Sequence, residues 1–209
     1  MTVFVKICGI KSRQALEAAV SGGADAVGFI VGVPSSPRNL TLDEARDLRL
    51  EVPNEVKTVL VMVPQFLDEV VHAVQYVKPD LVQLHGVEFD ASKISVPVIR
   101  GVTNRTPHEE VQRIASNCDI ILLDSHKEGV HGGTGVPQNL EYSKIFIERT
   151  SPHPVILAGG MRPDTVEEAI CFARPFGVDV SSGVERSPGV KDPEKIRAFI
   201  AAAKSSGQE

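Results

Sequence analysis

Short runs of β-forming residues alternate with helical patterns along almost the whole chain, and this alternation limits the possible folds most. Such alternation implies parallel strands joined by right-handed crossovers. We predict eight strands, at about 3–8, 26–31, 57–63, 80–85, 97–102, 119–124, 154–159 and 178–182. Eight units in 209 residues predict a single-domain (β/α)8 TIM barrel over residues 1–209. A doubly wound open sheet is the rival, but no G-x-G-x-x-G motif follows the first strand.

Helix start and stop signals fit the intervals between the predicted strands. Thr41 and Glu44 match a capping box, and Gly22 and Gly23 match a helix stop after residues 13–21. Further helices are predicted over 65–77, 106–116, 139–149, 163–173 and 192–202, with Asp192 as N-cap and Pro193 in the first turn. The segment after Glu88 has the weakest helical pattern. Residues from about 203 to 209 are expected to form a frayed tail.

Composition and charge exclude several classes of function. The formal net charge of −5 gives no basic footprint for nucleic acid. No apolar run reaches the ~18 residues of a membrane helix, and the N-terminus has no secretory pattern. The three cysteines, Cys8, Cys118 and Cys171, are widely spaced, which argues against a disulfide framework or a zinc site and fits a reducing cytosol. We therefore expect a cytoplasmic protein without a nucleic-acid or membrane partner; its oligomeric state cannot be read from the sequence.

Polar side chains gather where the predicted strands end, which is the functional face of such a barrel. Because alternate residues share a strand face, Lys6 and Cys8 are predicted to point into the barrel. The same reasoning pairs Gln83 with His85, Leu122 with Asp124, and Asp179 with Ser181. Each residue alone has an ordinary structural explanation, but buried polar groups are costly unless paired. Their convergence predicts a site, with Lys6 and Asp179 as an ion pair beneath it.

Glycine-rich segments follow three of the later strands. Residues 157–161 read LAGGM and residues 179–185 read DVSSGVE, and backbone N–H groups beside glycine can approach an oxyanion closely. These adjacent ends predict a phosphate site at Gly159, Gly160, Ser181, Ser182 and Gly183. The long segment 125–139 contains four glycines and is predicted to be a lid.

Eight short stretches match one enzyme family in order along the chain. They are VKICGI (5–10), GADAVGFI (23–30), SPR (36–38), VQLHG (82–86), LLDS (122–125), GGTG (132–135), LAGG (157–160) and DVSSGVERSPGVKD (179–192). Together they resemble the phosphoribosylanthranilate isomerases of tryptophan biosynthesis. The sequence departs from the family pattern at 136–140, after GGTG, and at 62–64, where the third strand ends.

The resemblance implies a (β/α)8 barrel with a phosphosugar substrate and without cofactor or metal. It implies an Amadori rearrangement of N-(5-phosphoribosyl)anthranilate, an aminoaldose, to the 1-deoxyribulose 5-phosphate aminoketose. By this likeness Cys8 is the general base, Asp124 is the general acid, and Arg38 meets the anthranilate carboxylate. The backbone around Gly160, Ser182 and Gly183 would hold the phosphate. The other expected substrate-binding residues are Gln83, His85, Gly133 and Asp179.

The implied chemistry sets conditions on the acid and the base. Asp124 must be protonated when it acts, although a free aspartate titrates near ~3.9, so its pKa must be raised. Cys8 must act as a thiolate, although a free thiol titrates near ~8.5. Lys6 would favour the thiolate, and would do so less if Asp179 neutralises it; the sequence leaves both possibilities open.

Three other readings have weaker support. A histidine-pathway barrel catalyses the same rearrangement with two aspartates, but here a cysteine stands in the base position and no half-barrel repeat is visible. A phosphosugar-binding barrel without activity would be expected to lack the acid or the base, and both residues are present. An interaction scaffold fits least, because the polar groups gather at strand ends.

Overall fold

Eight parallel strands close into a ring in the computed structural model, which describes residues 3–125 and 139–206. The strands are β1 (Phe4–Cys8), β2 (Ala26–Val31), β4 (Lys57–Met62), β5 (Leu81–Leu84), β6 (Val98–Thr103), β7 (Ile120–Asp124), β8 (Val155–Leu157) and β9 (Gly177–Val180). Pairing of β1 with both β2 and β9 closes the ring, and the short β3 (Asn39–Leu40) adds to β2 outside it. The predicted barrel is therefore confirmed.

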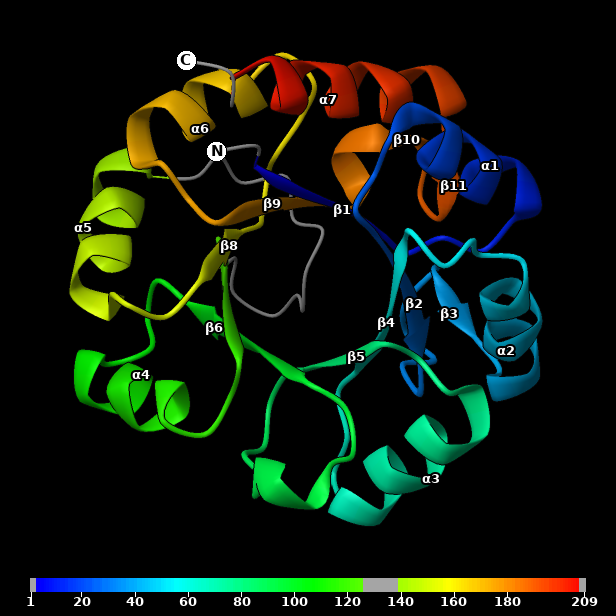
Figure 1. Cartoon of the computed structure of the whole chain (residues 1–209), viewed down its shortest axis with the longest axis horizontal. Coiled ribbons are helices and arrows are strands. Elements are labelled where there is room, and N and C mark those ends of the chain that lie inside the picture. The colour runs from blue at the N-terminus through cyan, green and yellow to red at the C-terminus, as the bar shows by residue number, and fades with distance from the viewer. Residues whose placement is uncertain (1–2, 126–138, 207–209) are drawn as a thin grey trace.

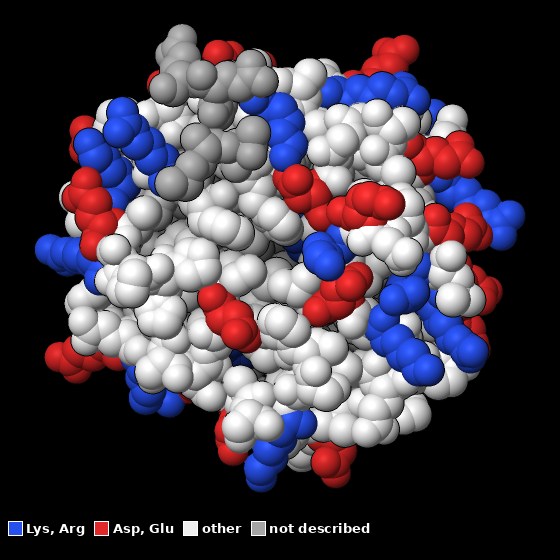
Figure 2. Space-filling view, viewed as in Figure 1, with Lys and Arg blue, Asp and Glu red and all other residues white. Residues whose placement is uncertain are grey.

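Helices surround the ring of strands, as Figure 1 shows, and in the same view basic and acidic side chains are interspersed around the rim of the molecule (Figure 2). They are α1 (Arg13–Gly22), α2 (Leu42–Leu50), α3 (Leu67–Val77), α4 (His108–Ala115), α5 (Leu140–Thr150), α6 (Val166–Ala173) and α7 (Pro193–Ser205). Between β5 and β6 only a 3-10 turn forms, η1 (Ala91–Lys93), at the segment with the weakest helical pattern. None of these helices is long and apolar enough to cross a membrane; the search covered the described residues.

The predicted helix signals act as expected. The Thr41 side chain accepts from the Glu44 backbone N–H while the Glu44 side chain accepts from that of Thr41, so the capping box is complete. Gly23 ends α1 with φ of 88°, a left-handed conformation that glycine adopts without strain. Asp192 accepts from the N–H groups of Glu194 and Lys195 and starts α7. Local side chains therefore fix where these helices begin and end.

Some predicted boundaries were wrong. Residues 203–205 do not belong to a frayed tail, because α7 continues to Ser205 and Ala203 is fully buried; residues 207–209 of the expected tail lie outside the described residues. Strand β8 ends at Leu157 rather than at 159, because Gly159 and Gly160 turn the chain with φ of 80° and 64°. After β9 the chain forms a 3-10 turn, η2 (Ser182–Val184), and an unpredicted hairpin of β10 (Glu185–Ser187) and β11 (Val190–Lys191).

Alternation along each strand separates an outer apolar layer from the barrel interior. Val5 and Ile7 belong to the large cluster under the helices, whereas Cys8 packs inside with small and branched residues of the other strands. Phe199 of α7 is fully buried in the outer cluster. The predicted orientation of β1, with Lys6 and Cys8 inward, is thus confirmed.

Truncation of Phe199 tests the outer layer. We expect Phe199→Ala to lower the free energy of unfolding by about 3–5 kcal/mol, because it removes a buried ring and leaves a cavity. Arg197→Ala on the exposed face of α7 should change it by less than about 0.5 kcal/mol. Urea unfolding measures both, and equal effects would contradict this packing.

Candidate active site

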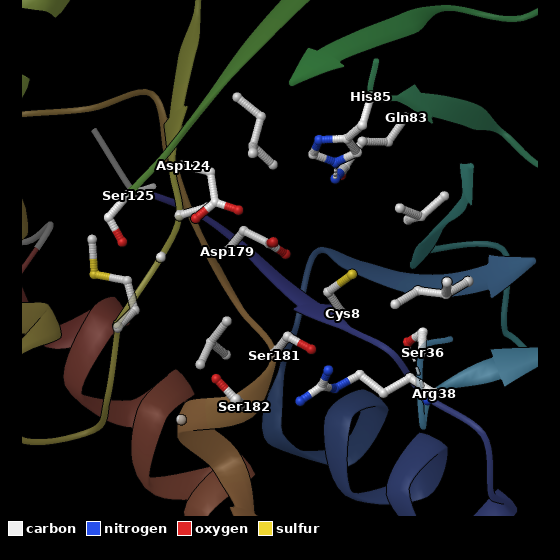
Figure 3. Close-up of a pocket in the computed structure, with 18 of the residues that line it drawn as sticks. Cys8, Ser36, Arg38, Gln83, His85, Asp124, Ser125, Asp179, Ser181 and Ser182 are labelled. Carbon is white, nitrogen blue, oxygen red and sulfur yellow. Dashed lines mark hydrogen bonds between the residues drawn. The ribbon is translucent and has the colours of Figure 1, made fainter. Parts of the chain in front are cut away.

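A pocket opens at the carboxyl ends of the barrel strands, where the sequence predicted function. It holds about 1050 Å³ of empty space, which includes part of the open solvent at its mouth. The predicted residues that line it are Cys8, Arg38, Gln83, His85, Asp124, Gly159, Gly160, Asp179, Ser181, Ser182 and Gly183. Figure 3 shows Cys8 and Asp124 entering this pocket from different strands, with Asp179 between them in the view. Gly133 and the predicted lid, apart from its end residues, lie outside the described residues.

An ion pair lies at the floor of the pocket. Lys6 on β1 and Asp179 on β9 are directly paired in register, and Nζ of Lys6 donates to Oδ1 of Asp179 at 2.8 Å. The Lys6 side chain is fully buried, and a Cβ on Gly28 would lie only 3.3 Å from its Cε, so a glycine in β2 leaves it room. Burial alone would lower the pKa of Lys6, but Asp179 and then Cys8 outweigh it and raise the pKa. The predicted pair is confirmed, and Lys6 is charged.

Asp124 at the end of β7 is a weak acid in this environment. Burial, and next the negative charge of Asp179, raise its pKa to about 7, although Lys6 and the N–H of Ser125 act in the opposite direction. Its Oδ1 is buried and has no hydrogen-bond partner among the described residues. A Cβ on Gly159 would overlap with that oxygen, so this glycine is needed for the position of the carboxyl group. Near neutral pH Asp124 can therefore hold a proton and give it up.

Cys8 is a buried thiol at the end of β1. Its exposed fraction is 4%, and burial, and next Asp179, raise its pKa above the ordinary value of a thiol, although Lys6 and Lys191 lower it in part. Gly28 leaves space here too, because a Cβ there would lie 3.0 Å from Sγ. Cys8 is therefore protonated at neutral pH, and the ion-paired Lys6 favours the thiolate without overcoming burial.

Gln83 and His85 form one unit on β5 and its end. Their Nε2 atoms lie 2.8 Å apart, so the two side chains are hydrogen-bonded, and the tautomer of the His85 ring sets which of them donates. The ring lies over Gly101 of β6, where a Cβ would overlap with it. Oε1 of Gln83 is buried and has no partner among the described residues. The unit presents hydrogen-bonding groups to the pocket.

The loops after β8 and β9 approach each other closely. A Cβ on Gly183 would overlap with the carbonyl oxygen of Met161, so only glycine fits between them. Gly160 and Ser182 line the pocket at this contact, and Figure 3 shows the Ser181 and Ser182 hydroxyls on the same side of the pocket. The two loops are therefore held together by a close backbone contact at this edge of the pocket.

Arg38 lies in the pocket wall but has a protein partner that sequence reasoning missed. Its Nε and Nη2 donate to the two carboxylate oxygens of Glu185 at 2.7 and 2.8 Å. Lys191 also donates to Glu185, at 3.0 Å. Both missed residues stand in the DVSSGVERSPGVKD stretch, and their place in this stretch was the available sequence signal.

Residues 62–64 differ from the family pattern, and of these three only Val63 lines the pocket. The second departure, at 136–140, lies mostly outside the described residues. Among residues 3–125 and 139–206, no group of three or more His, Cys, Asp or Glu side chains is placed to hold a metal ion.

Comparison with known proteins gives one consistent match. The family model for N-(5′-phosphoribosyl)anthranilate isomerase matches residues 5–202. A protein of that name from Thiobacillus denitrificans is 42% identical over 213 residues, covering 99% of this chain and all of that one. The sequence resemblance is therefore confirmed over almost the whole length.

Solved structures give the same result. Phosphoribosyl anthranilate isomerase from Thermotoga maritima matches with a TM-score of 0.84 and 35% identity, covering 97% of this chain and 99% of that one. A structure of a phosphoribosyl anthranilate isomerase with reduced 1-(o-carboxyphenylamino)-1-deoxyribulose 5-phosphate matches with a TM-score of 0.81 and 34% identity, over 97% and 99% of the two chains.

The raised pKa of Asp124 predicts a pH-dependent stability. The folded protein binds this proton with a pKa of about 7, against about 3.9 for a free aspartate. The resulting stabilisation is full below about pH 4 and is lost as pH rises through about 7. Between these values the free energy of unfolding of the wild type should fall relative to that of Asp124→Asn, whose amide stays neutral.

Urea unfolding at pH 4 to 8 measures this difference. Asp68→Asn, which removes an exposed carboxylate on α3, is the matched control for loss of a carboxylate. A difference between wild type and Asp124→Asn that stays constant with pH would mean that Asp124 titrates as an ordinary aspartate.

The buried ion pair predicts strong coupling between its two residues. Lys6→Met leaves Asp179 charged and unpaired in the barrel floor, so we expect a loss of about 3–5 kcal/mol in stability. Lys6→Met with Asp179→Leu removes both charges and should recover at least half of that loss. Additive losses in a double-mutant cycle would show that the two residues are not coupled.

Proposed function

Because the chain belongs to the N-(5′-phosphoribosyl)anthranilate isomerase family, we propose that it catalyses the Amadori rearrangement of that aminoaldose, with Asp124 as acid and Cys8 as base. The product is 1-(2-carboxyphenylamino)-1-deoxyribulose 5-phosphate, an intermediate of tryptophan biosynthesis in the cytoplasm. One observation carries the assignment of roles. An aspartic acid with a pKa of about 7 and a buried thiol enter one pocket beside a glycine-lined edge.

Asp124 acts first, on the closed sugar ring. Its proton goes to the ring oxygen as the bond between that oxygen and C1′ breaks. The lone pair of the anthranilate nitrogen forms a double bond to C1′, which leaves a positively charged Schiff base and the Asp124 carboxylate. A pKa near the working pH suits an acid that must hold its proton before this step and release it during the step.

Cys8 acts on the Schiff base. Its thiolate takes the proton from C2′, and the electrons of that bond form a C1′–C2′ double bond while the nitrogen regains its lone pair. The resulting enol takes a proton at C1′ from the Cys8 thiol and gives its hydroxyl proton to the Asp124 carboxylate, which forms the ketone and returns both residues to their starting protonation states. Across the reaction, C2′ loses a proton and C1′ gains one, while the former ring oxygen gains a proton and the C2′ hydroxyl loses one. The product is therefore an isomer of the substrate.

The proton must be on the correct residue when each step occurs. In the empty site Asp124 has the lower pKa and Cys8 the higher, so a single shared proton resides mainly on Cys8. The active arrangement, protonated Asp124 with a Cys8 thiolate, is therefore the minor form of the singly protonated pair. Lys6 and the positive charge of the Schiff base both favour the thiolate, which supports Cys8 as the base in the later step.

The remaining pocket residues divide the substrate between them. Arg38 suits the anthranilate carboxylate, because a guanidinium binds a planar anion through two N–H groups. The backbone around Gly160, Ser182 and Gly183 is proposed to bind the phosphate, beside Gly159 and Ser181. Gln83, His85 and Asp179 would contact the sugar part between these ends, and Gly133 would approach from the predicted lid. The proposed small-molecule partner is this phosphosugar.

Substitution of the acid and the base tests the proposal. We expect Cys8→Ser and Asp124→Asn each to lower kcat about 10²- to 10⁴-fold, the usual contribution of a positioned acid or base. Loss of phosphoribosylanthranilate fluorescence measures the conversion. Cys171→Ser changes an exposed cysteine and is the matched control.

The outcomes separate the activity from the roles. A wild-type protein that leaves the substrate unchanged would reject the function. A wild type that converts it, with a folded Cys8→Ser variant of similar kcat, would reject Cys8 as the base. Circular dichroism and thermal unfolding establish that each variant is folded.

A further inference from the structure

Three loops meet around the Arg38 side chain. The stem of Arg38 crosses Gly9, where a Cβ would lie 2.7 Å from its Cδ. Pro37, the residue before Arg38, approaches Gly189 so closely that a Cβ there would lie 2.5 Å from its carbonyl oxygen. Loops after β1, β2 and β9 therefore contribute to the position of a single side chain.

The carboxylate that holds Arg38 is itself fixed on several sides. The Glu185 side chain is 5% exposed and accepts from Arg38 through both oxygens, which is a bidentate pair. Lys191, whose side chain is 1% exposed, donates to the same carboxylate and to the carbonyl oxygen of Ser181. The N–H of Gly189 donates to Glu185 at 3.2 Å. These contacts hold the Glu185 carboxylate in place, so it in turn restricts the movement of the Arg38 guanidinium.

This pairing uses only one edge of the Arg38 guanidinium. Nε and one N–H of Nη2 point to Glu185, and among the described residues Nη1 and the second N–H of Nη2 have no hydrogen-bond partner. Arg38 lines the pocket, and Figure 3 shows its guanidinium beside Ser181 and directed toward the pocket interior. The free edge has the fork geometry that a second carboxylate can accept. The cluster of Arg38, Lys191 and Glu185 contains two basic groups and one carboxylate, so its net charge is not negative.

We propose that Glu185 is a positioning residue that holds Arg38 in the orientation that selects a carboxylate on the aromatic ring of the substrate. The inference rests on the proposed function, in which Arg38 meets that carboxylate. An arginine that is already ordered loses less conformational freedom on binding, so its contact contributes more to affinity. A purely structural role, folding of the β10–β11 hairpin, would affect all ligands equally.

Two matched inhibitors separate these roles. One is reduced 1-(o-carboxyphenylamino)-1-deoxyribulose 5-phosphate, and the other is the same compound made from aniline, which lacks the carboxylate. We expect Glu185→Gln to weaken the carboxylate-bearing inhibitor about 3- to 10-fold, which is the order of the cost of immobilising one long side chain. Binding of the aniline compound should stay within about twofold. Isothermal titration calorimetry measures both.

The variants are chosen so that folding does not obscure the result. Glu185→Asp keeps a negative charge between Arg38 and Lys191 but is shorter by one methylene group, and it should show the same selective loss. Arg186→Gln changes the exposed neighbour in β10 and should bind both inhibitors as the wild type does. In an Arg38→Met background, Glu185→Gln should have no further effect on the ratio of the two affinities.

Equal weakening of both inhibitors, or no change in either, would overturn the positioning role of Glu185. A different result addresses the proposed function. If Arg38→Met weakens both inhibitors equally, then Arg38 does not bind the carboxylate, and the premise fails independently of Glu185.

Discussion

The ion pair between Lys6 and Asp179 is the interaction on which the pocket depends. A fully buried ammonium group must be paired, and its partner stands directly opposite it on β9, the strand that closes the ring against β1. The register of these two strands is therefore tied to the position of the charges beneath the pocket. Asp179 is the second cause, after burial, of the raised pKa of Asp124, while Lys6 favours the Cys8 thiolate. One member of the ion pair thus raises the pKa of the proposed acid, and the other lowers the pKa of the proposed base.

Glycine positions create the space in which these side chains lie. Gly28 makes room for Lys6 and Cys8, Gly159 for Asp124, and Gly101 for His85. In each case a methyl group would come too close to the functional side chain itself. Gly9, which follows Cys8 directly, makes room for the stem of Arg38. The site is therefore determined as much by the residues that leave space as by those that carry chemistry.

The sequence predicted the barrel because alternation and capping are local signals. It predicted the inward side chains as well, because strand periodicity fixes the face once the strand is known. It could not predict that Glu185 pairs with Arg38, because 147 residues separate them and only the packed loops bring them together. The hairpin that carries Glu185 and Lys191 is very short and shows no alternating pattern. The order of the pKa values of Asp124 and Cys8 depends on burial, which composition does not reveal.

The pH dependence of kcat/KM tests the central claim most directly, since it reports the protonation states that the free enzyme needs. If the active form combines a protonated Asp124 with a Cys8 thiolate, kcat/KM should fall below about pH 7 and stay level up to the raised pKa of Cys8, above 9.0. A kcat/KM that instead falls steadily from about pH 7 upward would show that only the proton on Asp124 is required. That result would contradict Cys8 as the base.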